Sequence, residues 1–341
     1  MGRSIAFVQP RGGAGKSTTV VQLAASIAEA NPESTVIVVD ASVHADATHM
    51  LMGGFQEPET TEGGFTTRGA ELAAEHKDKT FSVLLQDLAR ATTTTLWRHV
   101  EPEVDVTARS LSVCEVHPQG GAPPNLRLVC GGGGGTGDAH KNVQRIGTAL
   151  GAAMGRAPEG TIFLLDMDAE AAERHMSAVA VLAASELALV TTANWSEFLR
   201  CVTDPHNGLA LSAAGKKIKH VVFTKVEKTR NEECALEGVT CLGFKPLNAS
   251  LENVSTITAY AYARANSTTS VLYNMLDASG SLQDFVSAHV LALPSLPETV
   301  LNHSVMTATP IAGMQPAPGV AADALAAAKQ QIAFAARRLV V

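Results

Sequence analysis

A glycine-rich stretch near the start of the chain has the residue types and spacing of a phosphate-binding loop. An apolar run over residues 5–8 stops at Pro10, and a tight run over residues 12–15 leads into Lys16-Ser17. Glycines have no Cβ atom, so their backbone can approach an oxyanion and direct successive N–H groups at it. Residues 16–30 have helical apolar spacing, and a helix N-terminus adds further donors. This order predicts binding of a nucleoside triphosphate; the alternative is an ordinary glycine-rich turn.

Each residue of the loop has an expected task in this chemistry. Lys16 would reach the β- and γ-phosphates, and the Ser17 hydroxyl would ligate Mg²⁺. We therefore predict ATP and Mg²⁺ as cofactors. The predicted nucleotide-binding residues are Gly12, Gly13, Ala14, Gly15, Lys16, Ser17 and Thr18.

Two further apolar runs each end in a carboxylate. The run over residues 36–39 ends at Asp40, and the run over residues 162–165 ends at Asp166. Buried parallel strands have such continuous apolar runs, and ligands bind beyond their carboxyl ends. Asp166 is the predicted second metal ligand, in a Walker B pattern, because one carboxylate at a strand end can hold Mg²⁺ opposite Ser17. Asp40 is a predicted catalytic residue that would hold the metal-bound or attacking water.

Strand-like and helix-like segments alternate along the chain. This alternation predicts an α/β fold: a three-layer, doubly wound, mostly parallel sheet, as in P-loop NTPases. The expected strands are 3–8, 35–39, 126–129, 161–165, 187–190, 220–223 and a short one at 240–242. The expected helices are 16–30, 47–52, 81–89, 138–154, 171–184, 195–212, 253–263, 268–277 and 281–291.

We expect residues 1–292 to form one P-loop domain with a variable surface insertion at about 55–125. Residues 293–320 are Pro-rich and predict a loose linker, and the Ala-rich residues 321–338 predict a docked or frayed terminal helix. A second glycine run, residues 131–135, lacks a following Lys-Ser or Lys-Thr. It favours a flexible connection over a second ligand site.

The composition of the chain indicates which kinds of partner and which cellular compartment are expected. The net charge of −7 disfavours nonspecific DNA binding by the chain as a whole. The only basic cluster, with Lys216, Lys217, Lys219, Lys225, Lys228 and Arg230, indicates a solvated face or else a weak nucleic-acid site. The five scattered cysteines favour a reduced, cytoplasmic protein. The residues carry neither a secretory signal nor an apolar run of ~18 residues, so a membrane location is not expected.

Residues 9–19 resemble the loop of the ParA/MinD group of deviant Walker ATPases, which reads x-Lys-Gly-Gly-x-Gly-Lys-[Ser/Thr]-Thr. Residues 39–53 resemble the second motif of that family, and residues 163–198 resemble its Walker B strand with the following helix and strand. The similarity covers residues 1–54 and 126–225 and weakens towards 290. The resemblance implies a single P-loop domain that dimerises on ATP and positions plasmids, chromosomes, division septa or other large cargo.

Two departures from the family pattern bear on hydrolysis. The signature lysine of the family, which crosses the dimer interface to the phosphates of the partner, is Arg11 here. Arginine keeps the charge, so we predict a catalytic role for Arg11; merely solvating the loop is the alternative. The second aspartate of the family, which orients the attacking water, is Ser42 here. Losing such a group can cost on the order of 10²-fold in rate, so binding should survive better than turnover.

Thr224 and Lys225 stand where the family often has an adenine-reading asparagine, so the sequence leaves the preference for the base open. Asp168 replaces a common proline, and its role is also left open.

The leading hypothesis is an ATP-dependent homodimerisation switch with slow hydrolysis of ATP to ADP and phosphate, which positions or partitions a cargo through a protein activator or adaptor. The alternative is a hydrolysis-deficient nucleotide-binding scaffold that acts through protein contacts. A third possibility is a P-loop amidoligase or small-molecule kinase, for which the sequence shows no substrate-binding motif.

Overall fold

A computed structural model gives the fold of this 341-residue chain. It describes residues 2–9, 13–42, 44–53, 74–94, 104–132, 142–167, 174–192, 218–226 and 278–340. The helix expected at 195–212, the strand at 240–242 and the helices at 253–263 and 268–277 lie outside these residues.

The described residues form an eight-stranded sheet in the order β3-β4-β2-β5-β1-β6-β7-β8. Its pairs are parallel except at one edge, where β3 runs antiparallel to β4. The strands are β1 Arg3–Val8, β2 Thr35–Ala41, β3 Leu111–Ser112, β4 Leu126–Val129, β5 Thr161–Met167, β6 Glu186–Thr192, β7 Ile218–Val226 and β8 Val290–Pro294.

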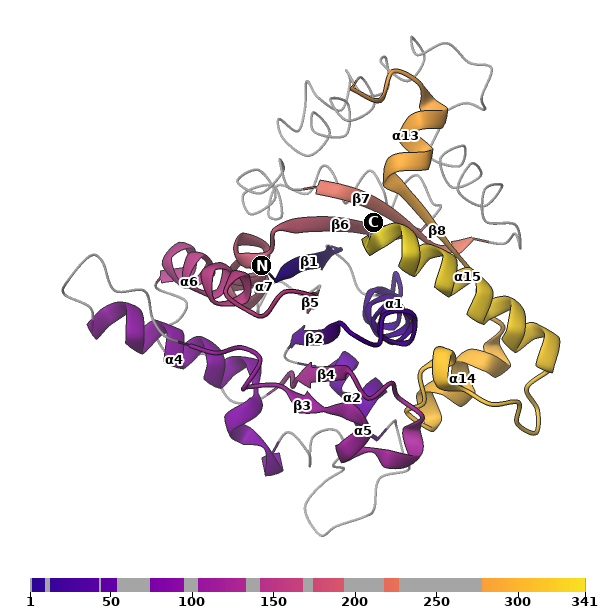
Figure 1. The fold of residues 1–341 in the computed structure, drawn as a ribbon, viewed down its shortest axis with the longest axis horizontal. Coiled ribbons are helices and arrows are strands. Elements are labelled where there is room, and N and C mark those ends of the chain that lie inside the picture. Colours follow the sequence, from indigo (N-terminus) through magenta and orange to yellow (C-terminus); the bar gives the residue numbers. More distant parts are fainter. Residues whose placement is uncertain are drawn as a thin grey trace.

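Helices cover both faces of the sheet, which confirms the predicted three-layer α/β fold (Figure 1). One hydrophobic core joins the sheet to α4 Phe81–Thr94, α6 Val143–Gly155, α7 Arg174–Ala183 and α13 Leu282–His289. The other joins it to α1 Lys16–Ala30, α2 Asp46–Met52, α5 Val113–Val116, α14 Glu298–Met306 and α15 Ala322–Val340. Successive residues of β1 alternate between the two cores, since Ile5 and Phe7 join one and Ala6 and Val8 the other.

Part of the stretch expected as a surface insertion, residues 55–125, belongs to the core instead. Helix α4 buries Phe81, Leu84 and Leu88 completely, and β3 extends the edge of the sheet. Three-residue 3-10 turns, η1 Lys77–Lys79 and η2 Pro118–Gly120, lie beside these elements. The regular apolar spacing of α4 predicted its helix, but its neighbours in the fold are set by contacts with α6 and β2 that lie far away in sequence.

Residues 293–320, expected as a loose linker, instead form the end of β8, helix α14 and the 3-10 turn η6 Ile311–Gly313. A buried side chain of α1 holds them in place. Gln22 Nε2 donates to Ser304 Oγ at 3.1 Å, and Gln22 Oε1 accepts from the Ile311 backbone N–H at 2.7 Å. The Ser304 hydroxyl in turn donates to the Thr309 carbonyl oxygen. These hydrogen bonds between buried polar groups replace the hydrogen bonds to water that a loose linker would keep.

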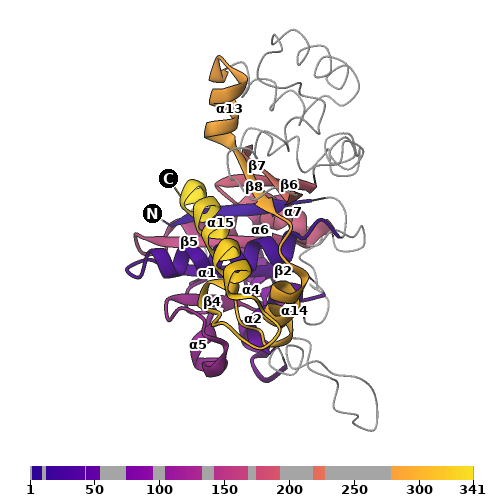
Figure 2. The ribbon, with the colours of Figure 1, turned by 90° about the vertical axis from the view of Figure 1, so that its right-hand side faces the viewer.

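The Ala-rich terminal helix α15 docks along α1, as Figure 2 shows. Its apolar side is buried in the same core as α1. The buried residues include Leu325, Ala328, Ile332, Ala335, Ala336 and Leu339. Small side chains let the two helices approach closely, so α1 is enclosed between the sheet and α15.

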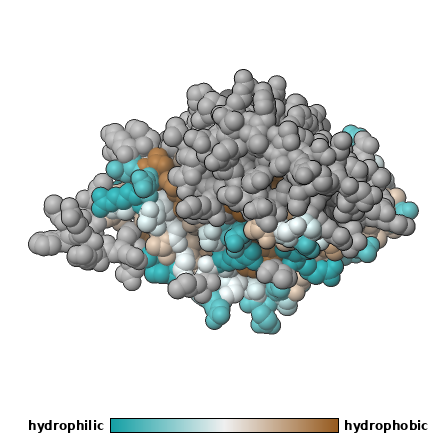
Figure 3. Space-filling view, turned by 90° about the horizontal axis from the view of Figure 1, so that it is seen from above, coloured by the Kyte–Doolittle hydropathy of each residue, from teal (hydrophilic) through white to brown (hydrophobic). Residues whose placement is uncertain are grey.

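Large hydrophobic side chains are rarely exposed among the described residues. Met306, 53% exposed, is the single exposed large hydrophobic residue among them. Seen from above, teal and pale residues cover most of the described surface (Figure 3). Within the described parts of the chain, no helix combines the length and the apolar character that crossing a membrane requires.

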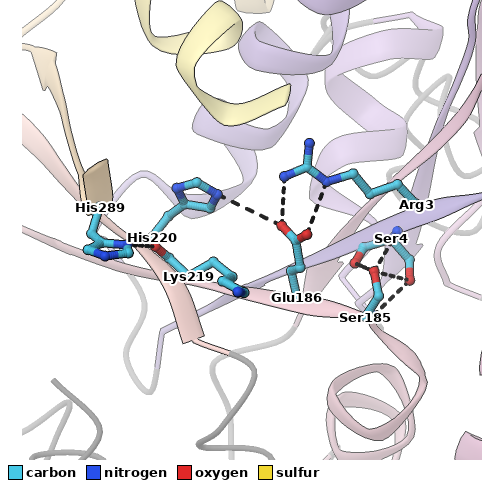
Figure 4. A network of polar contacts seen from close by, with 7 residues as sticks. All are labelled: Arg3, Ser4, Ser185, Glu186, Lys219, His220 and His289. Carbon is cyan, nitrogen blue, oxygen red and sulfur yellow. Dashed lines mark hydrogen bonds and ion pairs between the residues drawn. The ribbon is translucent and has the colours of Figure 1, made fainter. Parts of the chain in front are cut away.

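A polar network ties the amino ends of the central strands together (Figure 4). Arg3 of β1 makes a bidentate ion pair with Glu186 of β6, at 3.2 and 2.7 Å. Beside it, the Ser185 hydroxyl donates to the Ser4 carbonyl oxygen at 2.7 Å, and the Ser4 N–H donates to Ser185 Oγ at 3.0 Å. Bidentate pairs fix geometry as well as adding energy, so the network holds β1 and β6 in register.

His220 of β7 lies at the edge of this network. Its Nε2 is 3.9 Å from Glu186 Oε2, too long for a hydrogen bond, and neither ring nitrogen has a hydrogen-bond partner among the described residues. Burial lowers the pKa of His220 to about 4, although the Glu186 carboxylate acts in the opposite direction. The ring is therefore neutral at physiological pH.

Replacing Gln22 by alanine should destabilise the protein by about 1–3 kcal/mol, because the Ile311 N–H and the Ser304 hydroxyl lose their partner. Urea denaturation would measure the loss. Glu29→Ala, at an exposed position of the same helix, is the control and should change stability by less than ~0.5 kcal/mol. Equal stability of the two variants would show that Gln22 does not hold the C-terminal segment.

Candidate functional site

The loop that precedes α1 has the backbone of an anion-binding turn. Gly13 and Gly15 have φ angles of 87° and 75°, in the left-handed region that glycine adopts without strain. Gly15 is the N-cap of α1, and the Thr19 N–H donates to its carbonyl oxygen to begin the helix. The N-terminus has no side-chain cap and no acidic residue in its first turn. The N–H groups of residues 16–18 belong to the first turn of α1. This N-terminal end of the helix therefore attracts negative charge.

Lys16 makes a buried ion pair with Asp166. Its Nζ lies 3.0 Å from Asp166 Oδ1, and the two side chains are 9% and 0% exposed. The second carboxylate oxygen, Asp166 Oδ2, is buried and has no hydrogen-bond partner among the described residues. An unpaired buried oxygen is costly unless something satisfies it, so the pair marks a place where a ligand can add contacts.

Asp40 lies beside Asp166, because the two residues are Cα partners in the parallel pair of β2 and β5. Three donors hold its buried carboxyl group. The Ser42 N–H donates to Oδ1 at 3.1 Å, and the N–H and hydroxyl of Thr48 each donate to Oδ2 at 2.8 Å. Burial, together with the neighbouring charge of Asp166, raises the pKa of Asp40 to about 7, although these hydrogen bonds lower it.

The start of the second glycine run packs directly on Asp40. The Gly131 N–H donates to the Thr48 hydroxyl at 2.8 Å. A Cβ atom at residue 131 would lie 2.5 to 2.7 Å from the carboxyl carbon and both carboxyl oxygens of Asp40. The sequence predicts a flexible connection here, but Gly131 is an ordered and buried neighbour of the site. Residues 133–135 of the run lie outside the described residues.

Ser42 is part of the turn that follows β2. Its side chain accepts from the His44 N–H at 3.1 Å, and its carbonyl oxygen accepts from the Gly132 N–H at 2.9 Å. The residue is only 3% exposed. The hydroxyl therefore helps to shape the turn around Asp40, a role that the sequence pattern did not suggest. The buried His49 lies nearby on α2, and burial lowers its pKa.

The carboxyl end of β7 also touches the loop. The Thr224 hydroxyl lies 2.6 Å from the Ala14 carbonyl oxygen, and Lys225 Nζ lies 2.6 Å from the Gly13 carbonyl oxygen. The sequence pattern places both residues where the ParA/MinD group often has an adenine-reading asparagine, and it also places Lys225 in the basic cluster, which indicates a solvated face or else a weak nucleic-acid site. The left-handed conformation of Lys225, with a φ angle of 58°, gives no signal in the sequence.

The fold thus brings together most of the predicted site residues that it describes. Residues 13–18 form the loop and first turn, Lys16 meets Asp166, and Asp40 lies next to Asp166. Their roles in binding and catalysis stay predictions. Arg11, Gly12, Asp168 and four of the six residues of the basic cluster lie outside the described residues.

The donor set suits a cation that takes only a few ligands from the protein. Within the described ranges, no group of three or more His, Cys, Asp or Glu side chains could hold a metal ion. Mg²⁺ commonly keeps several waters and binds through one or two protein oxygens together with phosphate oxygens. Asp166 Oδ2 and the half-buried Ser17 fit that requirement.

Comparison with known proteins gives a family and a fold. Residues 5–256 match a family model described as the CobQ/CobB/MinD/ParA nucleotide binding domain. No curated protein matches the chain.

Three solved structures of similar fold cover nearly the whole chain. A ParA family ATPase from Chlorobium tepidum is 14% identical, with a TM-score of 0.51 over 99% of this chain and 98% of that chain. A plasmid partition protein from Borrelia burgdorferi bound to AMPPNP is 13% identical, with a TM-score of 0.50 over 97% of each chain. The MinC:MinD cell division complex of Aquifex aeolicus gives 14% identity and a TM-score of 0.50, over 99% of this chain and 96% of that chain.

Gly131→Ala should destabilise the protein by about 1–3 kcal/mol and displace the Asp40 carboxyl group, because the new methyl group would overlap it. Thermal and urea denaturation would measure the change. The control is Gly155→Ala at the end of α6, where a Cβ atom meets nothing within 4 Å. The control should keep or slightly raise stability, as alanine favours the helix. Similar behaviour of both variants would contradict the packing of Gly131 on Asp40.

The raised pKa of Asp40 predicts how the free energy of unfolding depends on pH. The unfolded chain releases this proton near its ordinary pKa of 3.8 and the folded protein near 7. Between these values the folded state keeps a proton that the unfolded state has lost, so the contribution of Asp40 to stability falls as pH rises from about 4 to about 7.

Thr48→Val removes one donor to the Asp40 carboxyl group, so the pKa of Asp40 should rise above 7 and the fall in stability should extend to higher pH. Carboxyl ¹³C chemical shifts and urea denaturation between pH 5 and 8.5 would test both effects. Thr148→Val, on an exposed part of α6, is the control and should leave the titration of Asp40 unchanged. An unchanged or lowered pKa in Thr48→Val would refute this account.

Proposed function

The chain belongs to the CobQ/CobB/MinD/ParA nucleotide-binding family, and from this premise we propose that it is an ATP-dependent dimerisation switch that hydrolyses ATP slowly and positions or partitions a large cargo. The observation that carries the proposal is the arrangement of one loop and two carboxylates. Lys16, at the end of the phosphate loop, contacts Asp166, and Asp40 lies beside Asp166 at the same edge of the sheet.

The residues present fit ATP and Mg²⁺. The loop and the first turn of α1 would hold the phosphates, and Ser17 and Asp166 would hold the metal ion. When bound, Mg²⁺ neutralises phosphate charge that the protein would otherwise have to balance alone. Lys16 would exchange its contact with Asp166 for a contact with phosphate, which leaves both Asp166 oxygens free to accept from water or to ligate the metal.

Asp40 supports slow rather than fast hydrolysis. Three donors already occupy its carboxyl group, and a carboxylate has about four acceptor positions. One position is left for a water molecule, which agrees with a role in holding water. In the protein without a metal ion, a pKa of about 7 also leaves part of Asp40 protonated at neutral pH; a bound Mg²⁺ would lower that pKa. Ser42, in place of a carboxylate, adds a hydroxyl already engaged with His44.

The similar structures support the proposed assembly only in general terms. One neighbour is a complex of two different proteins, MinC and MinD, and another is a plasmid partition protein. We propose by analogy a homodimer that recruits a protein activator or cargo adaptor, with Arg11 reaching the nucleotide of the partner subunit. Free Cys114 and Cys130 support the proposed cytoplasmic location. Nonspecific DNA binding has only the basic cluster in its favour.

A hydrolysis-deficient nucleotide-binding scaffold is the second candidate. The observation that favours it is the turn at Ser42, whose hydroxyl accepts from the His44 N–H and so has less capacity to orient water. Both candidates bind nucleotide and differ in turnover.

The first test is the mass of the protein in solution with ATP, with ADP and without nucleotide. We expect ATP to double the mass and Lys16→Ala to abolish this change, with at least a ~10-fold loss of ATP affinity because a charged donor to phosphate is lost. Lys16→Ala also leaves Asp166 without its partner, so circular dichroism must confirm the fold. The double variant Lys16→Ala/Asp166→Asn relieves that charge. Lys219→Ala, at an exposed lysine at the amino end of β7, is the control. An unchanged mass with ATP would contradict the switch.

Phosphate release then separates the two candidates. Slow but measurable turnover by the natural protein would exclude the scaffold. No turnover, followed by a large gain in Ser42→Asp, would show that the missing carboxylate holds the protein inactive.

A further inference from the structure

The end of β7 holds two consecutive carbonyl groups of the phosphate loop. The Thr224 hydroxyl lies 2.6 Å from the Ala14 carbonyl oxygen and 3.3 Å from the Thr191 carbonyl oxygen. A hydroxyl has a single proton to donate, and the shorter distance favours Ala14. Lys225 Nζ donates to the Gly13 carbonyl oxygen. Thr224 is 4% exposed, so its contact is shielded from water.

Because the peptide bond is planar, these two contacts also fix the direction of the Ala14 and Gly15 N–H groups. The carbonyl of Gly13 shares its peptide plane with the Ala14 N–H, and the carbonyl of Ala14 shares its plane with the Gly15 N–H. In a trans peptide the C=O and N–H bonds point in opposite directions, and the described residues contain no cis peptide. With both carbonyl oxygens drawn towards β7, the Ala14 and Gly15 N–H groups must point away from β7.

The backbone of Lys225 has a conformation that is unfavourable for lysine. Its φ angle of 58° lies in the left-handed region, which costs a residue with a Cβ atom about 1–2 kcal/mol. Glycine would adopt this conformation without strain, so a lysine here is better explained by its ammonium group than by its backbone. Strained residues of this kind gather at functional sites. The side chain of Lys225 is exposed to solvent, but its ammonium group has a specific partner in the Gly13 carbonyl oxygen.

We propose that Thr224 and Lys225 are positioning residues of the phosphate site. By holding the Gly13 and Ala14 carbonyls, they aim the Ala14 and Gly15 N–H groups at the anion before it arrives, irrespective of the base that the anion carries. This inference rests on the proposed binding of nucleotide by residues 13–18. It assigns the end of β7 to phosphate binding, although these residues stand where the ParA/MinD group often has an adenine-reading asparagine.

Matched substitutions separate the proposed contacts from a merely structural role. Thr224→Val keeps the shape of the side chain and removes the hydroxyl, whereas Thr224→Ser keeps the hydroxyl. Lys225→Gly removes the ammonium group and relieves the backbone strain, so it should be at least as thermally stable as the natural protein. Lys225→Arg keeps a positive donor. Calorimetric titration with Mg²⁺ and either ATP or inorganic tripolyphosphate reads phosphate binding with and without a base.

We expect Thr224→Val and Lys225→Gly to weaken both ATP and tripolyphosphate about 10-fold, with Thr224→Ser and Lys225→Arg retaining most of the affinity. Undiminished tripolyphosphate affinity in Thr224→Val and Lys225→Gly would overturn the proposal, and a loss confined to ATP would assign these residues to the base instead.

Amide hydrogen exchange of residues 13–15 in the nucleotide-free protein distinguishes failure of this inference from failure of the proposed function. Thr224→Val and Lys225→Gly should exchange faster than the natural protein, because the loop loses its tethers. Unchanged exchange would refute the tether whatever the nucleotide result. Failure of the natural protein to bind either probe would instead refute the proposed function, and with it the role of the tether in phosphate binding.

Discussion

Two buried carboxyl groups at matched positions of neighbouring parallel strands set the constraint on which the site depends. Asp40 and Asp166 are register partners, and both are fully buried. Burying two negative charges side by side is unfavourable unless they are paired, hydrogen-bonded or protonated. The fold uses all three means: Lys16 pairs with Asp166, three donors hold Asp40, and the pKa of Asp40 rises to about 7.

This constraint explains why segments far apart in sequence meet at the carboxyl ends of the central strands β2 and β5. Lys16 comes from the first turn of α1, Thr48 from α2 and Gly131 from the turn after β4. The amino ends of the central strands use polar groups differently, because Arg3 and Glu186 form a closed ion pair that ties β1 to β6. The carboxyl ends thus keep an oxygen of Asp166 unsatisfied, whereas the charged groups at the amino ends hold the strands together.

Local patterns in the sequence predicted the parts of the fold and site that depend on neighbours in the chain. The glycine spacing located the loop, and the apolar runs that end in aspartate located the ends of β2 and β5, because strand burial leaves a continuous apolar signature. Contacts between distant residues left no such signal. Gln22 meets Ile311 across nearly the whole chain, and Thr224 meets Ala14. The run at residues 290–293 was too short to separate strand from helix by periodicity, and β8 was missed.

The C-terminal segment is best understood as part of the support of the loop. An N-terminal helix end binds an anion well only if its N–H groups are already aimed and cannot turn away when charge arrives. Helix α1 meets that condition because the sheet packs on one side of it and α15 on another, while Gln22 anchors it to residues 304 and 311. Thr224 and Lys225 hold the loop that leads into it. The geometry around Lys16 is therefore fixed from both ends of the chain, although the residues that would do the chemistry lie mostly in its first half.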